Sequence, residues 1–379
     1  MKKLRVVVIG TGNVASVAIR CLKGREDVEL VGVWAHKETA GHLIGTDSGC
    51  LDIDDPNGII ITGDEEEIFA LHPDCAVMAI NIRDPRAASL VNGAWYKKFL
   101  VRGINVVSPS VPDLMWPSKA MNKPFVEEIE KAALEGNASI YINGQEPGFA
   151  ENQAMLLATC SNTIKTLTIT EMYNYSSSPA RAELAPSYGF DEDMDFVPML
   201  SIPDVQKMVW GLTIHHIANA FGYELEDITC SFEKRVTDKD LEVGWGTIKA
   251  GKVGAVRVRT CGIVNGREAI VIEHVNRMTQ DIAKDWPYTD RVGQIRVNIE
   301  GDPNLQVDMN VGVPERPEEL SYDGYILTAM RIVNAIPYVC NAKPGILTVH
   351  DLPMTLPSSA FRSDVTFMEG HKICSPTKK

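Results

Sequence analysis

The chain has 379 residues and a formal net charge of −13 at pH 7, from 37 Lys and Arg against 50 Asp and Glu. An acidic surface repels phosphate groups, so this charge argues against nucleic acid or an anionic membrane as the main partner. With 45% hydrophobic and 23% charged residues, the composition is typical of soluble globular proteins, and the length suffices for two domains with separate cores. The first predicted strand begins close to Met1, and no apolar run could span a bilayer, so we expect a cytoplasmic protein.

The cysteines are scattered through the sequence without a C-x-x-C pair or a companion histidine spacing. This pattern predicts free structural thiols rather than a disulfide framework or a metal site. The sequence also lacks a P-loop, an H-E-x-x-H motif and a G-x-S-x-G motif. The cysteines are Cys21, Cys50, Cys75, Cys160, Cys230, Cys261, Cys340 and Cys374.

The most specific signal lies near the start of the chain. An apolar, β-branched run over residues 4–9 is followed directly by G-x-G-x-x-A and then by a helical pattern. This is the dinucleotide-binding fingerprint in its required strand–turn–helix context. Gly10 permits the tight turn, Gly12 lets the backbone approach a pyrophosphate, and Ala15 lets helix and strand pack closely, while the helix N-terminus attracts phosphates. The predicted cofactor-binding residues of this turn are Gly10, Thr11, Gly12, Asn13, Val14 and Ala15.

The second predicted strand, residues 28–34, is followed by the position expected to contact the adenosine ribose. NAD-specific sites usually have a carboxylate there, which binds the ribose 2′-hydroxyl. In this chain Ala35, His36 and Lys37 follow the strand, with no acid before Glu38. Two potentially cationic side chains favour a 2′-phosphate, so the sequence favours NADP over NAD and predicts His36 and Lys37 as cofactor-binding residues. The alternative is that both are solvated loop residues and that Glu38 binds the ribose of NAD.

Strands and helices continue to alternate up to residue 147. This alternation predicts an α/β fold with a Rossmann-type, doubly wound parallel sheet over a dinucleotide-binding domain of residues 1–147. Ligands of such sheets bind at the carboxyl ends of the strands. Asn81 and Ser108, which end two of the strands, are therefore predicted to bind the cofactor. The predicted strands are 58–62, 75–81, 104–108 and 139–142, and the predicted helices are 64–71, 86–102 and 123–135.

The pattern changes after residue 147. Mostly antiparallel strands with one helix, at 204–221, predict an α+β C-terminal domain with an open mixed sheet over residues 148–322, for substrate binding and dimerisation. Asn265 and Gly266 predict a tight hairpin, and the prolines between 179 and 198 predict a polar loop. A final apolar helix, 325–338, is expected to return to the first domain within a C-terminal segment, 323–379. The predicted strands are 165–170, 227–236, 253–264, 268–277, 294–301 and 306–311.

Two acids follow strands of the first domain, where we expect the substrate to bind. Hydride transfer to C=O or C=N requires a proton donor or an electrostatic partner near the reacting atom, and Asp113 and Glu146 are the predicted catalytic residues. Alternatively, Asp113 caps a turn and Glu146 is a hinge carboxylate bonded to the backbone. Glu171 and Tyr173, at the end of the first strand of the second domain, are predicted to bind substrate. We expect one histidine of the pair 215–216 to be a core residue.

Several segments resemble a known group of enzymes. They are the nucleotide turn, the Glu-Pro-Gly-Phe turn at 146–149, the hairpin strand at 266–278, and two C-terminal motifs, Pro-Gly-Ile at 344–346 and Asp-Leu-Pro at 351–353. The chain resembles the dihydrodipicolinate-reductase-like superfamily, and within it most closely 2,4-diaminopentanoate dehydrogenase and the native amine dehydrogenases. The resemblance implies a Rossmann domain, a C-terminal substrate and dimerisation domain, and a final helix that returns to the first.

Three differences qualify the resemblance. The His-His-Arg-His signature of dihydrodipicolinate reductase and its lysine are absent, so we do not expect a role in lysine biosynthesis. In the amine dehydrogenases a glutamate in a Glu-Glu-Leu-like segment binds the amine, whereas this chain has Pro112-Asp113-Leu114. The family's Asn-Pro-Gly turn near the nicotinamide reads Glu146-Pro147-Gly148 here. Compared with the family, this chain thus has a shorter acid at Asp113 and an additional acid at Glu146.

The sequence therefore predicts an NAD(P)-dependent oxidoreductase that transfers hydride to or from a C=N carbon of a small, largely apolar substrate. NADP is the favoured cofactor, and a homodimer is expected. The alternative within the same class is an NADP-dependent carbonyl reductase that does not use ammonia. The alternative from another class is a non-catalytic NADP-binding redox sensor.

Overall fold

The computed structural model describes residues 2–52, 55–80, 82, 85–120, 122–312, 320–358, 360 and 361. Internal contacts divide the chain into two compact units. The first unit comprises the described residues up to Gln145 together with those from Tyr325 onward, and the second unit is Glu146–Gly324. Asn81, one predicted cofactor-binding residue, and the end of the C-terminal tail lie outside the described residues.

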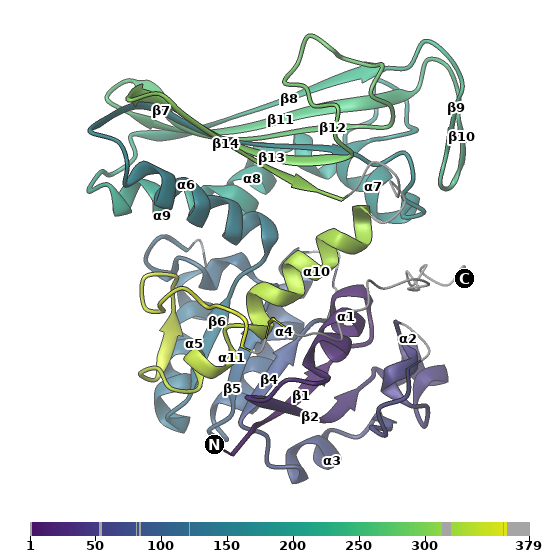
Figure 1. The fold of residues 1–379 in the computed structure, drawn as a ribbon, viewed down its shortest axis with the longest axis vertical. Helices are drawn as coiled ribbons and strands as arrows, with labels where there is room; N and C mark the ends of the chain where they lie inside the picture. Colours follow the sequence, from purple (N-terminus) through teal and green to yellow (C-terminus); the bar gives the residue numbers. More distant parts are fainter. Residues whose placement is uncertain are drawn as a thin grey trace. The chain divides into compact units, whose positions relative to one another are not determined.

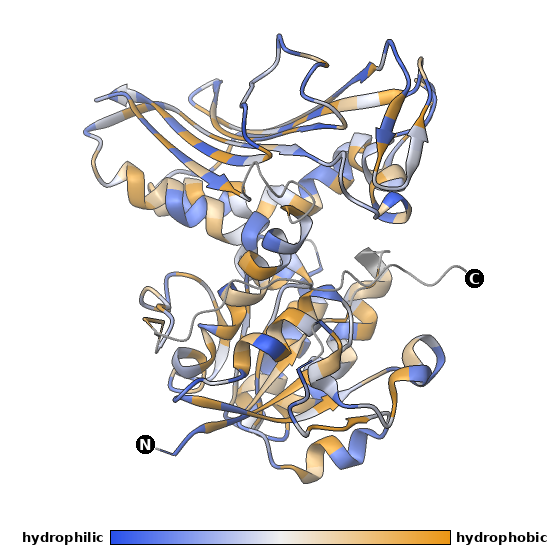
Figure 2. Ribbon diagram, turned by 45° about the vertical axis from the view of Figure 1, so that its right-hand side comes forward, coloured by the Kyte–Doolittle hydropathy of each residue, from blue (hydrophilic) through white to orange (hydrophobic). Residues whose placement is uncertain are grey.

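The first unit is built on a seven-stranded parallel sheet with the order β15-β6-β5-β4-β1-β2-β3 (Figure 1). Figure 2 shows its central strands as hydrophobic along their length, because both faces of a parallel sheet are covered. The doubly wound Rossmann prediction is confirmed. The strands are β1 Leu4–Ile9, β2 Val28–Trp34, β3 Ile61–Thr62, β4 Cys75–Met78, β5 Asn105–Ser108, β6 Ser139–Ile142 and β15 Gly345–Leu347.

Helices cover both faces of this sheet, and their ends follow local capping rules. The Asn122 side chain, for example, caps the start of α5 by accepting a hydrogen bond from the Phe125 N–H, and Asn137 ends the helix in the left-handed conformation at φ 54°. Trp95 and Phe99 of α4 are buried in the core of the unit. The helices are α1 Asn13–Leu22, α2 Lys37–Ala40, α3 Glu65–Ala70, α4 Pro85–Leu100 and α5 Lys123–Gly136.

Three features of the first unit differ from the predictions. The predicted strand 58–62 is reduced to β3, because residues 59–61 bond to the backbone of residues 45–48 instead. The predicted helix 325–338 is two helices, α10 Leu320–Val333 and α11 Ile336–Val339, and the proline at the start of α11 disfavours a continuous helix. Strand β15 was not predicted; it comes from the far end of the chain and pairs in parallel with β6.

The second unit is an α+β layer with a six-stranded sheet of order β14-β13-β7-β12-β11-β8. Only the β7–β12 pair is parallel within this sheet, so the predicted open mixed sheet is confirmed. The helices α6 Ala150–Ala158, α8 Pro203–Gln206 and α9 Leu212–Ala220 lie on one face (Figure 1). The strands are β7 Thr163–Asn174, β8 Asp227–Val236, β11 Val253–Val264, β12 Arg267–Arg277, β13 Gly293–Asp302 and β14 Leu305–Val311.

The details of the second unit both confirm and correct the predictions. Asn265 and Gly266 have φ of 53° and 69°, as the predicted tight hairpin requires. The predicted polar loop contains a helix, α7 Arg181–Tyr188, and a small hairpin of β9 Leu241–Val243 and β10 Gly246–Ile248 was missed. Strand β7 is longer than predicted, so positions 171 and 173 lie within the sheet.

Candidate active site

The two glycines of the nucleotide turn have different surroundings. Gly10 has φ +120°, and a Cβ there would lie 2.6 Å from the carbonyl oxygen of Ala79, which follows β4. A Cβ on Gly12 would meet no atom within 4 Å. Gly10 is thus required by the fold itself, whereas Gly12 leaves open space in front of the backbone, as the close approach of a pyrophosphate requires.

The N-terminus of α1 opens onto this turn. Gly12 is the N-cap and no side chain caps the helix, while the Gly12 carbonyl accepts hydrogen bonds from the N–H and hydroxyl of Ser16. The N–H groups of Asn13, Val14 and Ala15 belong to the first turn, where an α-helix offers them no internal acceptor. Ala15 is fully buried against the sheet. The residues therefore fit the phosphates of a dinucleotide.

His36 and Lys37 are exposed just beyond β2. The His36 ring packs edge-on against Trp34, and its Nδ1 accepts a hydrogen bond from the Glu38 N–H at 3.3 Å, which caps α2. This bond fixes the ring and leaves Nε2 available. The position expected to bind the ribose therefore presents an imidazole, bonded through one of its two nitrogens, and a lysine. The backbone N–H of Glu38 is used in the cap of α2.

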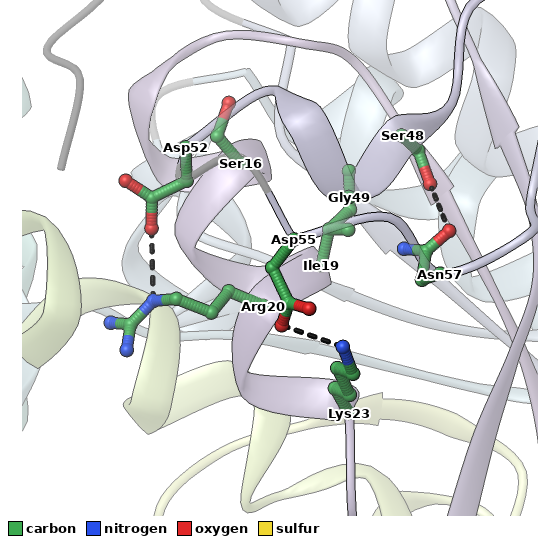
Figure 3. Close-up of a pocket in the computed structure, with 9 residues that line it drawn as sticks. All are labelled: Ser16, Ile19, Arg20, Lys23, Ser48, Gly49, Asp52, Asp55 and Asn57. Atoms are coloured by element: carbon green, nitrogen blue, oxygen red, sulfur yellow. Dashed lines mark hydrogen bonds and ion pairs between the residues drawn. The ribbon is translucent and has the colours of Figure 1, made fainter. Parts of the chain in front are cut away.

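The segment after α2 is organised by Asp47, whose carboxylate accepts hydrogen bonds from three backbone N–H groups between residues 49 and 58. Two ion pairs, Arg20–Asp52 at 2.9 Å and Lys23–Asp55 at 2.6 Å, tie this segment to α1 (Figure 3). The pocket between them has a volume of only about 10 Å³, room for a single water at most. Figure 3 therefore shows a docked loop and not a substrate site.

The turn after β5 contains two of the predicted residues. Ser108 is fully buried, and its hydroxyl accepts hydrogen bonds from the Tyr96 hydroxyl at 2.8 Å and the Ser110 N–H at 3.1 Å. This side chain shapes the turn, and its predicted cofactor contact stays a prediction. Val111 has φ 69°, a costly conformation for a β-branched residue. It leads directly into the half-buried Asp113.

In the second unit, Glu171 of β7 and His274 of β12 are register partners on adjacent parallel strands and share one face of the sheet. His274 Nδ1 lies 3.1 Å from Glu171 Oε1, and His274 Nε2 lies 3.7 Å from Glu146 Oε1. All three side chains are less than a tenth exposed. A fourth buried residue, Glu151, lies in the first turn of α6. We call Glu146, Glu151, Glu171 and His274 the buried array.

Electrostatics fix the protonation of this array. Burial by itself lowers the pKa of His274, but the carboxylates of Glu171 and Glu146 outweigh burial and raise that pKa to about 10. Burial, and then the nearby Glu146 carboxylate, raise the pKa of Glu151 well above its usual range. The array thus holds an imidazolium at His274 and a neutral carboxylic acid at Glu151. A buried charge is costly unless an opposite charge accompanies it.

Three atoms of the array are also buried without a hydrogen-bond partner among the described residues: Glu146 Oε1, Glu151 Oε1 and His274 Nε2. Leaving a buried polar group unpaired typically costs about 1–3 kcal/mol, so such groups call for an explanation. A ligand with an N–H donor would satisfy the Glu146 oxygen. The array is therefore suited to a small cation with N–H groups.

Aromatic side chains surround the array. The Trp210 ring lies 4.6 Å from the His274 ring, between centroids. Tyr173 and Tyr175 are in edge contact at 5.9 Å, and Tyr175 lies 6.1 Å from Tyr188. Burial, with Tyr188 and Glu171 nearby, raises the pKa of Tyr175 well above its usual range, so its hydroxyl is neutral. The surroundings thus combine buried carboxyl groups with apolar ring faces.

The structure brings three of the predicted residues together: Glu146, Glu171 and the neighbouring Tyr173. It places the fourth, Asp113, in the other unit. Prediction missed His274 and Glu151. A polar pair, Glu273-His274, directly after the apolar run 269–272 was a signal for the histidine. A glutamate in the first turn of a helix gave no signal, because acids are common there. His216 is buried, as expected of one histidine of its pair.

Comparison with known proteins identifies the family. The family model of the 2,4-diaminopentanoate dehydrogenase C-terminal domain matches residues 208–367. An amine dehydrogenase from Streptomyces virginiae is 31% identical over 358 residues, which cover 93% of this chain and 96% of that protein. The chain belongs to the amine dehydrogenase family. The 2,4-diaminopentanoate dehydrogenase of Acetoanaerobium sticklandii is 27% identical, covering 93% of this chain and 94% of that protein.

A solved structure agrees in fold. The amine dehydrogenase from Mycobacterium smegmatis superposes with a TM-score of 0.71 at 20% identity, covering 94% of this chain and 98% of that one. The predicted resemblance is confirmed. The protein is an enzyme, an amine-dehydrogenase-like oxidoreductase with a nicotinamide cofactor, NAD or NADP. Within the described residues, no helix combines the length and apolar character needed to cross a membrane.

Proposed function

We propose that this amine dehydrogenase family member transfers hydride to or from the C=N carbon of a small, largely apolar amine, and that Glu146 of the buried array binds the nitrogen. The observation that carries this proposal is the buried Glu146 Oε1, which accepts no hydrogen bond from the described residues and lies within a cluster of buried glutamates beside His274. An ammonium or iminium group supplies the missing donor, and its positive charge suits a cluster of three glutamates and one histidine. The aromatic rings around the array favour an apolar remainder of the substrate.

The residues of the Gly10–Ala15 turn would hold the pyrophosphate of the cofactor. Bound nicotinamide dinucleotide supplies or accepts the hydride. His36 Nε2 and the Lys37 ammonium support a preference for NADP, because both suit a 2′-phosphate and no carboxylate ends β2. The protein's own residues then have to bind the amine and move protons.

Glu146 takes a proton from the substrate ammonium, which frees the nitrogen lone pair needed to form C=N as the hydride leaves carbon. In the reverse direction Glu146 returns that proton to the amine product. His274, held charged by Glu171, can donate the Nε2 proton to a departing hydroxyl, which leaves as water when ammonia and a carbonyl compound condense to the imine. Asp113 remains the second candidate for the amine-binding acid, by its place after β5.

The first measurement is consumption of NADPH and of NADH with a panel of ketones and aldehydes, each with and without ammonium. We expect consumption that requires ammonium. Consumption indifferent to ammonium would instead make the protein a carbonyl reductase, and cofactor binding without any turnover would favour a redox-sensing binding protein.

The variant Glu146→Gln tests whether Glu146 is the acid–base group of the reaction. Removing a general acid–base group typically costs a factor of roughly 10²–10⁴, so we expect kcat to fall by about a hundredfold or more. Affinity for the cofactor should stay unchanged, because the nucleotide turn lies in the other unit. The matched control is Glu127→Gln, at an exposed glutamate of α5. Full activity of Glu146→Gln would refute the assignment and leave Asp113 as the candidate.

We also propose that the enzyme is a homodimer. Helices α6, α8 and α9 lie on one face of the six-stranded sheet of the second unit (Figure 1), and we expect a second copy to cover the opposite face. Analytical ultracentrifugation tests this, and a monomer at micromolar concentration would refute it.

A further inference from the structure

The turn that carries Glu146 is held by another acid of the array. Gly148 has φ 140° and ψ −80°, and its N–H donates a hydrogen bond of 2.5 Å to Glu151 Oε2. Glu151 is 1% exposed and lies at the start of α6, directly after this turn. Glu146 and Glu151 are thus the two ends of one short segment, and the Gly148–Glu151 bond lies within it.

We propose that Glu151 is a positioning residue for Glu146, which holds the 146–149 turn through the Gly148 N–H and shares a single proton with the Glu146 carboxyl. The inference rests on the proposed function, because it assigns Glu146 to the amine. The two oxygens of Glu151 have separate roles, since Oε2 accepts from Gly148 while Oε1 is buried without another partner among the described residues. Burial, and then the nearby Glu146 carboxylate, raise the pKa of Glu151 well above its usual range.

The charges around the pair require that proton. With all three acids ionised and His274 charged, three negative charges would surround a single imidazolium, and the buried array would have a net charge of −2. A neutral Glu151 reduces this to −1 and donates its O–H to Glu146. The cations of the two strands that contact α6 pair with other acids: among the described residues, Arg296 of β13 is paired with Asp308 and Lys165 of β7 with Glu300.

The proton count closes over the reaction. Before the step, Glu146 is a carboxylate that accepts the O–H of neutral Glu151, and the substrate is R–NH₃⁺. After transfer, the N–H bond is broken, both acids are protonated, the amine is neutral, and the remaining Glu171–His274 pair has no net charge. Glu151 does not change its protonation; it fixes the position and basicity of Glu146.

The decisive comparison is between Glu151→Gln and Glu151→Ala. Glutamine keeps a carbonyl for the Gly148 N–H and an N–H for Glu146, so we expect kcat within about threefold of wild type at neutral pH, and an alkaline limb shifted upward because this group can no longer ionise. Alanine frees the turn, and misplacement of a catalytic group by about 1 Å can cost on the order of a hundredfold. We expect kcat to fall roughly ten- to a hundredfold, with little change in cofactor affinity. Glutamine as inactive as alanine, or alanine as active as wild type, would overturn the proposal.

A second measurement needs no substrate. The infrared spectrum of the protein should contain the C=O band of a buried protonated carboxylic acid near neutral pH. Glu151→Gln should remove this band, and the Glu127→Gln control should keep it. A band that persists in Glu151→Gln would overturn the shared proton, even if Glu151→Ala does not fold. Absence of amine turnover in the wild type would defeat the proposed function alone, since the infrared result stands apart from it.

Discussion

The two glycines of the nucleotide turn should respond in opposite ways to the same substitution. At Gly12 the backbone has φ −78° and ψ −177°, which alanine adopts freely, and the added methyl group meets no protein atom within 4 Å. Alanine is a poorer N-cap than glycine by roughly 0.5 kcal/mol, but the less flexible unfolded chain returns about 0.4–1 kcal/mol. We therefore expect Gly12→Ala to change the free energy of unfolding by less than about 1 kcal/mol.

At Gly10 the same methyl group would be strained. The φ of +120° costs a non-glycine residue about 1–3 kcal/mol, and the Cβ would lie 2.6 Å from the Ala79 carbonyl oxygen. We expect Gly10→Ala to destabilise the protein by more than about 3 kcal/mol, which is severe for one substitution.

Gly12→Ala should weaken cofactor binding with little change in the stability of the fold. The Gly12 methyl group would occupy the space of the pyrophosphate, so we expect the dissociation constant of NADPH to rise at least tenfold, about 1.4 kcal/mol, in a protein that is otherwise folded normally. Urea unfolding without cofactor and calorimetric titration measure the two effects. Gly41→Ala is the matched control, because a Cβ there also meets no atom within 4 Å. Wild-type cofactor affinity in Gly12→Ala would refute the placement of the pyrophosphate on this turn.

Two further predictions concern charge. The pKa of His274 is raised from about 6.5 to about 10 in the folded protein. The stabilising contribution of His274 is therefore complete below about pH 6.5 and is lost as the pH rises toward 10. The raised pKa of Glu151 also makes the folded protein less stable as the pH rises. The unfolding temperature should therefore fall from pH 7 to pH 10 by the equivalent of a few kcal/mol, on the order of one per pKa unit, and a calorimetric profile that is flat over this range would contradict the charged histidine. Lys37→Glu should weaken NADPH binding by about 1.5–3 kcal/mol, roughly ten- to a hundredfold, while NADH binding is kept or improved. Equal losses for both cofactors in a titration would show that Lys37 does not face the ribose 2′ position.

Features that depend on neighbouring residues were predicted, and features that depend on residues far apart in the chain were missed. The hairpin at Asn265 and Gly266 was predicted because an Asn-Gly pair readily adopts the two adjacent positive φ angles that a tight hairpin requires. Strand β15 was not, because three residues at 345–347 become a strand only by pairing with β6, some two hundred positions earlier in the chain. The single helix predicted over 325–338 had the right buried face, including Ala329 and Ile332, but not its break.

The sequence by itself determined the nucleotide turn and the alternation that places it on a parallel sheet. Those features are local: a glycine with positive φ, a second glycine without a side chain, and a helix that begins at once. The buried array was decided by tertiary structure alone. Glu171 and His274 are 103 residues apart and meet because β7 and β12 pair in one register. A slip of one residue would turn His274 to the other face of the sheet, so no local pattern specifies the contact. The protonation of Glu151 likewise depends on the depth of its burial beside Glu146, which only the folded chain provides.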